Sequence, residues 1–355
     1  MPLTVLVTGG AGYIGAHVVL ALARAGHAPL ILDSLVNSAA SVRSRLEGLA
    51  GTRIPLIVAD VRDRPALAGT FADHRIDAVV HCAGLKAVAE GEAQPLAYYD
   101  NNVQGSIALT LAMREAGVRM LVFSSSASVY GQPERNPVDE EFPVQPANVY
   151  GRTKRAIELM LQSLAASDPS WRIAVLRYFN PAGADASGEI GEAPARAPNN
   201  LVPILVDVAL GCRPEIQIFG DDYPTHDGTG VRDYIHVTDL AEGHVAALAH
   251  LARVPSVLTL NLGLGHGASV REVIAAFERA CGKRLPQRVG PRRAGDVAIY
   301  YADPARANAL LQWRAGRELD TICADAWRSA LRRRGWRQPA TGRGSGPPAD
   351  CDRMK

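Results

Sequence analysis

Several features are scarce in this chain of 355 residues. Its five cysteines are scattered without a C-x-x-C motif, and its histidines show no metal-binding spacing. No apolar run approaches the roughly 18 residues of a membrane-spanning helix, and the first apolar stretch is too short for a secretory signal. The net charge is only +2, which does not indicate a nucleic-acid partner. We therefore expect a cytoplasmic protein in a reducing compartment, with no metal, no membrane partner and no nucleic-acid partner.

The amino-terminal residues fit a dinucleotide-binding unit. A short apolar stretch leads into Gly9 and the pattern Gly10-x-Gly12-x-x-Gly15, and a helical segment follows. Such glycines allow a tight turn and let the backbone approach a pyrophosphate at the helix N-terminus. The next apolar stretch ends at Asp33, about 20 residues further on, where a carboxylate accepts a hydrogen bond from a ribose 2′-hydroxyl. Because this carboxylate would repel a 2′-phosphate, the sequence favours NAD over NADP.

Strand and helix patterns alternate through the first half of the chain. The apolar runs predict strands at residues 3–8, 29–32, 55–58, 78–82, 120–123 and 173–180, and a seventh further along the chain at residues 257–262. Nearly continuous apolar strands separated by helices predict an α/β fold with a doubly wound parallel sheet covered on both faces. Ligands of such sheets bind at the carboxyl ends of the strands. We therefore expect one functional rim that contains Asp33, Asp60, Ser124, Ser125, Ser126 and Asn180.

The composition changes after Asn180, where residues 181–200 are rich in Gly, Ala and Pro. We expect a NAD-binding domain over residues 1–180, with residues 235–262 packing back on it. A smaller, partly discontinuous α/β substrate domain is expected over residues 181–338, followed by a disordered tail over residues 339–355.

Two local patterns in the second half also carry predictions. Ser269 and Glu272 have the spacing of a capping box, which predicts a helix start. The run Arg332, Arg333 and Arg334 ends the last predicted helix, and we expect it to be a solvated face that offsets the helix dipole.

Tyr150 and Lys154 are four residues apart in a predicted helix, so their Cβ atoms lie about 5–6 Å apart on one face. A phenol is a poor base at neutral pH, because its pKa is near 10. A neighbouring ammonium lowers that pKa, so the pair is a candidate general base toward a sugar or alcohol hydroxyl. The same spacing also occurs on an ordinary, half-exposed helix face. The dinucleotide-binding glycine pattern near the N-terminus, which we call the fingerprint, favours the catalytic interpretation.

Further strings make the chain similar to the extended short-chain dehydrogenase/reductase family over residues 3–337. Besides the fingerprint they are residues 83–88 (AGLKAV), 98–103 (YYDNNV), 123–131 (FSSSASVYG), 176–181 (LRYFNP), 198–201 (PNNL) and 227–237 (DGTGVRDYIHV). Within this family, the chain resembles enzymes that epimerise UDP-hexoses at C4. The resemblance implies a Rossmann-type sheet, tightly bound NAD, and a homodimer formed through the predicted helix over residues 98–116 and the helix that carries Tyr150.

The resemblance also implies roles for single residues. Ser126, Tyr150 and Lys154 match the catalytic triad of the family: the tyrosine is the base, the serine relays its proton, and the lysine binds ribose and lowers the tyrosine pKa. Besides this triad and Gly9 and Gly12, NAD would contact Tyr13, Ile14, Asp33, Ser34, Leu35, Val36, Asn37, Ser38, Asp60, Val61, Cys82, Ala83, Gly84, Leu85, Lys86, Asn101 and Phe179. The UDP-sugar would contact Ser126, Tyr150, Asn180, Asn200, Leu201, Arg232, Arg293, Asp296 and Tyr300.

The implied reaction is a reversible oxidation of UDP-glucose or UDP-galactose to a 4-keto sugar. Tyr300 matches a position at which a large residue disfavours N-acetylated sugars, although a plain core aromatic accounts for it equally well. The alternatives are a UDP-N-acetylhexosamine epimerase, a nucleotide-sugar dehydratase or decarboxylase, and a non-catalytic NAD-binding regulator. A dehydratase usually has Thr-Asp-Glu where this chain has residues 124–126 (SSS), and a regulator tends to lose the tyrosine or the lysine.

Overall fold

A computed structural model describes residues 2–193, 198–293 and 295–335 of the chain. The predicted tail at residues 339–355, and the last three residues of the predicted substrate domain, lie outside the described residues.

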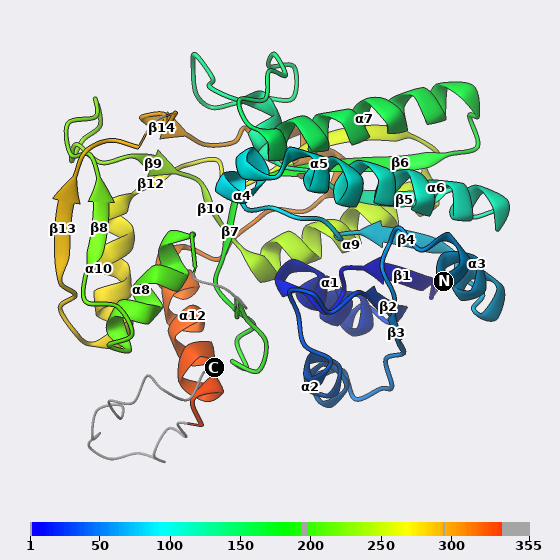
Figure 1. Cartoon of the computed structure of the whole chain (residues 1–355), viewed down its shortest axis with the longest axis horizontal. Coiled ribbons are helices and arrows are strands. Elements are labelled where there is room, and N and C mark those ends of the chain that lie inside the picture. The colour runs from blue at the N-terminus through cyan, green and yellow to red at the C-terminus, as the bar shows by residue number, and fades with distance from the viewer. Residues whose placement is uncertain (1, 194–197, 294, 336–355) are drawn as a thin grey trace.

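A seven-stranded sheet forms the centre of the larger part of the molecule (Figure 1). Its strands, in the order β11-β6-β5-β4-β1-β2-β3, all pair in parallel. They are β1 (Thr4–Thr8), β2 (Ala28–Asp33), β3 (Leu56–Val58), β4 (Ala78–His81), β5 (Met120–Ser124), β6 (Arg172–Tyr178) and β11 (Val257–Leu262). The strand order changes direction between β1 and β4, which is where such sheets bind ligands. The predicted α/β class with a parallel sheet is confirmed.

Helices cover both faces of this sheet. One face packs against α1 (Tyr13–Arg24), α2 (Ser41–Ala50), α9 (Val237–Arg253) and α11 (Ala305–Leu311), and the other against α3 (Arg64–Asp73), α6 (Gly105–Glu115) and α7 (Val149–Ser167). Successive side chains of a strand point to opposite faces, so Val5 and Val7 join the first core and Leu6 the second. Both faces are buried, and this is why the strands read as continuous apolar runs.

The predicted helix over residues 98–116 contains a π-helical turn in the structure. The chain passes through α4 (Val88–Ala93), α5 (Pro95–Tyr98) and the π-helical turn η1 (Tyr99–Gln104) before α6 begins. The buried amide of Asn102 lies in this turn, accepts from Leu85 N and donates to Thr153 Oγ1. A π-helical turn often marks a functional position, and here it joins the segment after β4 to the helix of Tyr150.

A second, smaller core lies beside the sheet. It is formed by α8 (Leu201–Ala209), α10 (Val270–Cys281), α12 (Leu319–Arg333) and the parallel pair β8 (Ile216–Phe219) and β13 (Gln287–Gly290). The predicted capping box at the start of α10 is confirmed, since Ser269 and Glu272 exchange both hydrogen bonds.

Five short strands run between the two cores: β7 (Asn180–Ala182), β9 (Val231–Arg232), β10 (Tyr234–His236), β12 (Ala268–Ser269) and β14 (Ile299–Tyr300). In the described part of the chain, no helix is long and apolar enough to cross a membrane.

Candidate active site

The glycine turn after β1 leaves room for backbone only. A Cβ at Gly15 would lie 2.1 Å from the carbonyl oxygen of Gly9, and one at Gly9, where φ is +68°, would lie 2.8 Å from the backbone of Ala83. Gly12 is the N-cap of α1, and among the described residues no side chain caps this helix. The N–H groups of its first turn therefore remain available to an anion such as a pyrophosphate.

Asp33 stands at the carboxyl end of β2 and organises the loop that follows. Its carboxylate accepts from the backbone N–H of Ala11 at 3.0 Å, from Leu35 N at 2.8 Å and from Ser38 Oγ at 2.8 Å. The acid thus ties the glycine turn to the predicted ribose loop at residues 34–38. Its place beside the turn fits the role of a ribose-binding acid.

Ser126, Tyr150 and Lys154 come together at the rim next to this turn. Ser126 follows β5 and caps the short 3₁₀ helix η2 (Ala127–Tyr130). Tyr150 and Lys154 lie in the first turns of α7, whose start is fixed by Asn148, which accepts from Gly151 N at 2.8 Å. The Lys154 Nζ atom lies 5.8 Å from the centre of the Tyr150 ring. The structure therefore groups the three predicted catalytic residues.

Burial sets the ionisation of this group. It raises the pKa of Tyr150 to about 12, against the lowering effect of a hydrogen bond from Ser126. Burial also lowers the pKa of Lys154 from 10.5 to about 8, against the opposite effects of Cys82 and Glu158. Lys154 Nζ donates to the Ser124 carbonyl at 2.8 Å. The shift of the Tyr150 pKa is thus opposite to the expected one, because burial outweighs the stabilisation of the phenolate.

Ser124 is the centre of a buried polar network that the sequence did not predict. Its hydroxyl lies 3.2 Å from Cys82 Sγ and 2.9 Å from His244 Nε2, and it also hydrogen-bonds Tyr178. Burial lowers the pKa of His244 to about 4 and raises that of Cys82 to about 11, so both side chains are neutral near pH 7. Ser124 thereby fixes the carbonyl that holds Lys154.

A buried ion pair lies one helical turn beyond Lys154. The Glu158 carboxylate accepts from Arg177 Nε at 2.9 Å and Nη2 at 2.7 Å, and from Ser125 Oγ at 2.7 Å. The pair joins α7, β6 and the end of β5, the elements that carry the triad. Neither Glu158 nor Arg177 was predicted as a functional residue, because their separation of 19 positions has no local pattern.

The predicted sugar-site residues fall into two groups. Arg232 pairs in register with Tyr300 between β9 and β14, and its Nη2 lies 3.7 Å from Asp296. The Tyr300 ring lies 5.0 Å from that of Phe179, and its hydroxyl donates to the carbonyl of Ala127, next to Ser126.

The second group lies around Glu192. Its carboxylate accepts from Asn200 Nδ2 at 3.1 Å and from Lys86 Nζ at 3.3 Å. Leu201 begins α8 directly after Asn200. The Arg293 side chain stacks over the Phe219 ring at 4.4 Å, and its backbone carbonyl accepts from Asp296 N at 3.2 Å.

The remaining predicted cofactor residues belong to segments that follow strands of the large sheet. The Tyr13 hydroxyl donates to the Gly183 carbonyl at 2.8 Å, and Asp60 forms an ion pair with Arg62 at 2.7 Å. Gly84 lies beside Lys154, since a Cβ there would be 3.6 Å from Lys154 Nζ. Asn101 is half-buried in η1, next to the bridging Asn102.

The parallel sheet, the glycine turn, the acid after β2 and the Ser/Tyr/Lys group define a Rossmann-type protein of the short-chain dehydrogenase/reductase class. The chain belongs to the NAD dependent epimerase/dehydratase family, whose sequence model matches residues 5–263.

Several relatives carry one name. The Yersinia pestis protein named UDP-glucose 4-epimerase is 52% identical over 324 residues, which is 91% of this chain and 96% of that protein. The UDP-glucose 4-epimerase of Bacillus subtilis is 49% identical over 326 residues, covering 92% of this chain and 96% of the relative.

Solved structures that resemble this chain carry the same name as these relatives. A UDP-glucose-4-epimerase from Stenotrophomonas maltophila with bound NAD and formylated UDP-arabinopyranose superposes with a TM-score of 0.92 at 51% identity, over 94% of this chain and 99% of that one. The enzyme from Bifidobacterium longum in complex with NAD+ and UDP has a TM-score of 0.90 at 44% identity, over 93% and 99%.

Proposed function

We propose that this chain interconverts UDP-glucose and UDP-galactose by epimerisation at C4, with NAD as a resident cofactor. The observation that carries the proposal is the grouping of Ser126, Tyr150 and Lys154 beside the glycine turn of α1. The names and bound ligands of the relatives support it. A dehydratase is disfavoured, because β5 ends in serines where elimination needs an acid.

The residues present fit a dinucleotide. The turn at Gly9 and Gly15 has space for backbone alone, the first turn of α1 can receive a pyrophosphate, and Asp33 ends β2 as a ribose acceptor. We assign cofactor contacts to the residues predicted from the sequence. When bound, NAD+ supplies reversible oxidation at a sugar carbon and a positive ring whose field favours a nearby phenolate.

Proton transfer falls to the chain itself. Tyr150 Oη accepts the proton of the sugar 4-hydroxyl and later returns it, and Ser126 Oγ holds the same oxygen and passes the proton between them. Lys154 binds the nicotinamide ribose, and a positive charge near Tyr150 favours the phenolate, whereas burial raises the Tyr150 pKa.

The nucleotide half of the substrate needs a firm anchor, because the 4-keto hexose must turn over so that C4 is reduced from its opposite face. The Arg232 guanidinium provides a fork for a diphosphate, with Asp296 beside it. We assign the uridine and diphosphate to Asn180, Asn200, Leu201, Arg232, Arg293 and Asp296.

Conversion of UDP-galactose into UDP-glucose, resolved by chromatography, tests the reaction. Wild-type protein should reach the same product mixture from either sugar without added NAD. Tyr150→Phe should lower turnover by at least about 100-fold, since a positioned base contributes that much, while circular dichroism stays unchanged. Wild-type turnover in this variant would refute the assignment of the base, and a wild type that converts neither sugar would leave a regulator as the better interpretation.

Selectivity against N-acetylated sugars is proposed for Tyr300. Its ring packs on Phe179 and its hydroxyl is held by the Ala127 carbonyl, so it occupies a fixed position next to Ser126. Tyr300→Cys would open this space and should add turnover of UDP-N-acetylglucosamine. If that activity does not rise while UDP-galactose turnover persists, Tyr300 is a packing residue.

We also propose a homodimer. Four apolar side chains are exposed on neighbouring elements that pack together, α4, α5, η1 and α7 (Figure 1). They are Val88, Leu96, Tyr99 and Leu159, and Leu96 is 83% exposed. Light scattering should give twice the chain mass, and Leu96→Glu should shift it toward the monomer; a wild-type monomer would refute the proposal.

Two further proposals concern the domain boundary and the cellular compartment. We propose that the NAD-binding and UDP-sugar-binding units divide near residue 180, and that the protein acts in the cytoplasm, which its few and scattered cysteines favour. Limited proteolysis and cell fractionation test these two points.

A further inference from the structure

The segment of residues 183–192, which we call the strap, connects the two cores. It leaves β7 at Gly183 and folds back on itself through a bridge between Ala184 and Gly191. Asp185 closes its turn by accepting from Ser187 N at 3.0 Å. Ala184 and Ile190 are buried, and Ile190 belongs to the larger core, so the strap is packed against the protein.

One side of the strap is fixed to the helices that follow the glycine turn. The Tyr13 hydroxyl, at the start of α1, donates to the Gly183 carbonyl at 2.8 Å. Arg24, at the end of α1, forms an ion pair of 2.8 Å with the nearly buried carboxylate of Asp185. From α2, Arg45 donates to the Glu189 carbonyl at 3.4 Å.

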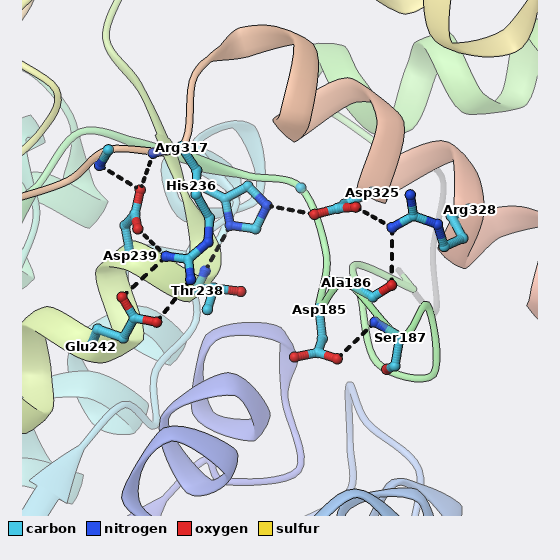
Figure 2. A network of polar contacts seen from close by, with 12 residues as sticks. Asp185, Ala186, Ser187, His236, Thr238, Asp239, Glu242, Arg317, Asp325 and Arg328 are labelled. Carbon is cyan, nitrogen blue, oxygen red and sulfur yellow. Dashed lines mark hydrogen bonds and ion pairs between the residues drawn. The ribbon is translucent and has the colours of Figure 1, made fainter. Parts of the chain in front are cut away.

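The other side is held by α12 (Figure 2). Arg328 donates to the Ala186 carbonyl at 2.9 Å and also pairs with Asp325. Arg332 pairs with Glu189, and Arg333 donates to the Glu192 carbonyl at 2.8 Å. The predicted solvated face of the arginine run therefore fits Arg332, which is exposed although it pairs with Glu189, and is wrong for Arg333, whose side chain is partly buried against the strap.

His236 packs against the start of the strap and hydrogen-bonds to α12. A Cβ on Gly183 would lie 3.0 Å from His236 Nε2, so the imidazole packs directly on the start of the strap. His236 Nδ1 accepts from the backbone N–H of Thr238 at 3.0 Å, which leaves the ring proton on Nε2. That proton faces Asp325 Oδ2 at 3.3 Å, and Asp325 in turn holds Arg328 (Figure 2).

We propose that His236, Asp325 and Arg328 are positioning residues that hold the strap against Tyr13 and so keep the dinucleotide from leaving. This inference rests on the proposed function, in which one NAD must stay bound through every turnover. The strap joins the fingerprint helix, at Tyr13, to the Glu192 carboxylate that binds Lys86 and Asn200. Release of the cofactor then requires the strap to separate from α12.

The test measures dinucleotide release without a sugar substrate. NAD-loaded Asp325→Asn is transferred into NAD-free buffer, and the NAD that stays with the folded protein is assayed over time after acid denaturation. We expect release at least about tenfold faster than from wild type, because hydrogen bonds to charged groups contribute enough for this factor. Added NAD should restore activity, which it would not do for an unfolded variant.

The matched control is Asp320→Asn, on the same helix, whose partner is the exposed Arg279. It should release NAD at the wild-type rate. If Asp325→Asn does not fold, Arg328→Gln, whose side chain is 43% exposed, provides the same test. Folded variants that release NAD at the wild-type rate overturn the proposal, even if they melt earlier. Failure of the proposed function would appear separately, as NAD uptake without sugar epimerisation.

Discussion

Lys154→Met should make the protein more stable and inactive at the same time. Lys154 is 3% exposed, and burial lowers its pKa from 10.5 to about 8. At about 1.36 kcal/mol per pKa unit, this shift means that holding the charged form in the folded state costs about 3 kcal/mol near pH 7. Methionine has a similar unbranched chain and removes the cost. It also leaves the Ser124 carbonyl without its partner, which costs about 1–3 kcal/mol. We therefore expect a net gain of about 1 kcal/mol.

The pH dependence identifies the cause. A lysine whose pKa is depressed by folding destabilises fully below the folded pKa of about 8, and this cost disappears as the pH rises toward the unfolded value of 10.5. The advantage of Lys154→Met in urea unfolding of NAD-free protein should therefore be larger near pH 7 than near pH 10.

Lys283→Met is the control, because Lys283 also donates to a backbone carbonyl, of Ala209, but is exposed. It should change stability by no more than about 0.5 kcal/mol at either pH. A Lys154→Met protein whose stability relative to wild type does not change with pH would refute the assigned role of burial.

Two other predictions concern the frame of the site. Gly15→Ala should prevent NAD binding, because the new Cβ would lie 2.1 Å from the Gly9 carbonyl oxygen. The NAD content of the protein after gel filtration measures this effect. The control is Gly48→Ala, whose Cβ meets nothing within 4 Å and which should retain the wild-type NAD content. Equal NAD content in both variants would contradict the role of the turn. Glu158→Ala should cost about 3–5 kcal/mol in urea unfolding, because it leaves Arg177 charged and buried. Arg155→Ala, which removes only the more exposed partner of Glu158, should cost less than about 1 kcal/mol, and similar losses in both variants would argue against the buried pair.

Much of the fold and part of the site follow from patterns within a few residues. The apolar runs predicted all seven strands of the sheet, because both faces of each strand are buried. Gly15 and Asp33 were recognisable because the turn and the strand end impose a fixed spacing. Tyr150 and Lys154 were recognisable because residues four apart share a helix face.

The surroundings of those residues were decided by the tertiary structure. Ser124 meets His244 across 120 positions, and His236 meets Asp325 across 89. No local spacing encodes such pairs, so neither the network behind Lys154 nor the strap was predicted.

The direction of the Tyr150 pKa shift also depends on tertiary structure and not on local spacing. The spacing to Lys154 is a property of the sequence and indicates a lowered pKa, whereas the folded chain buries the phenol and raises the pKa to about 12. Sequence alone determined which groups stand together along one helix. Tertiary structure decided their ionisation, because desolvation depends on every distant segment that packs around a group.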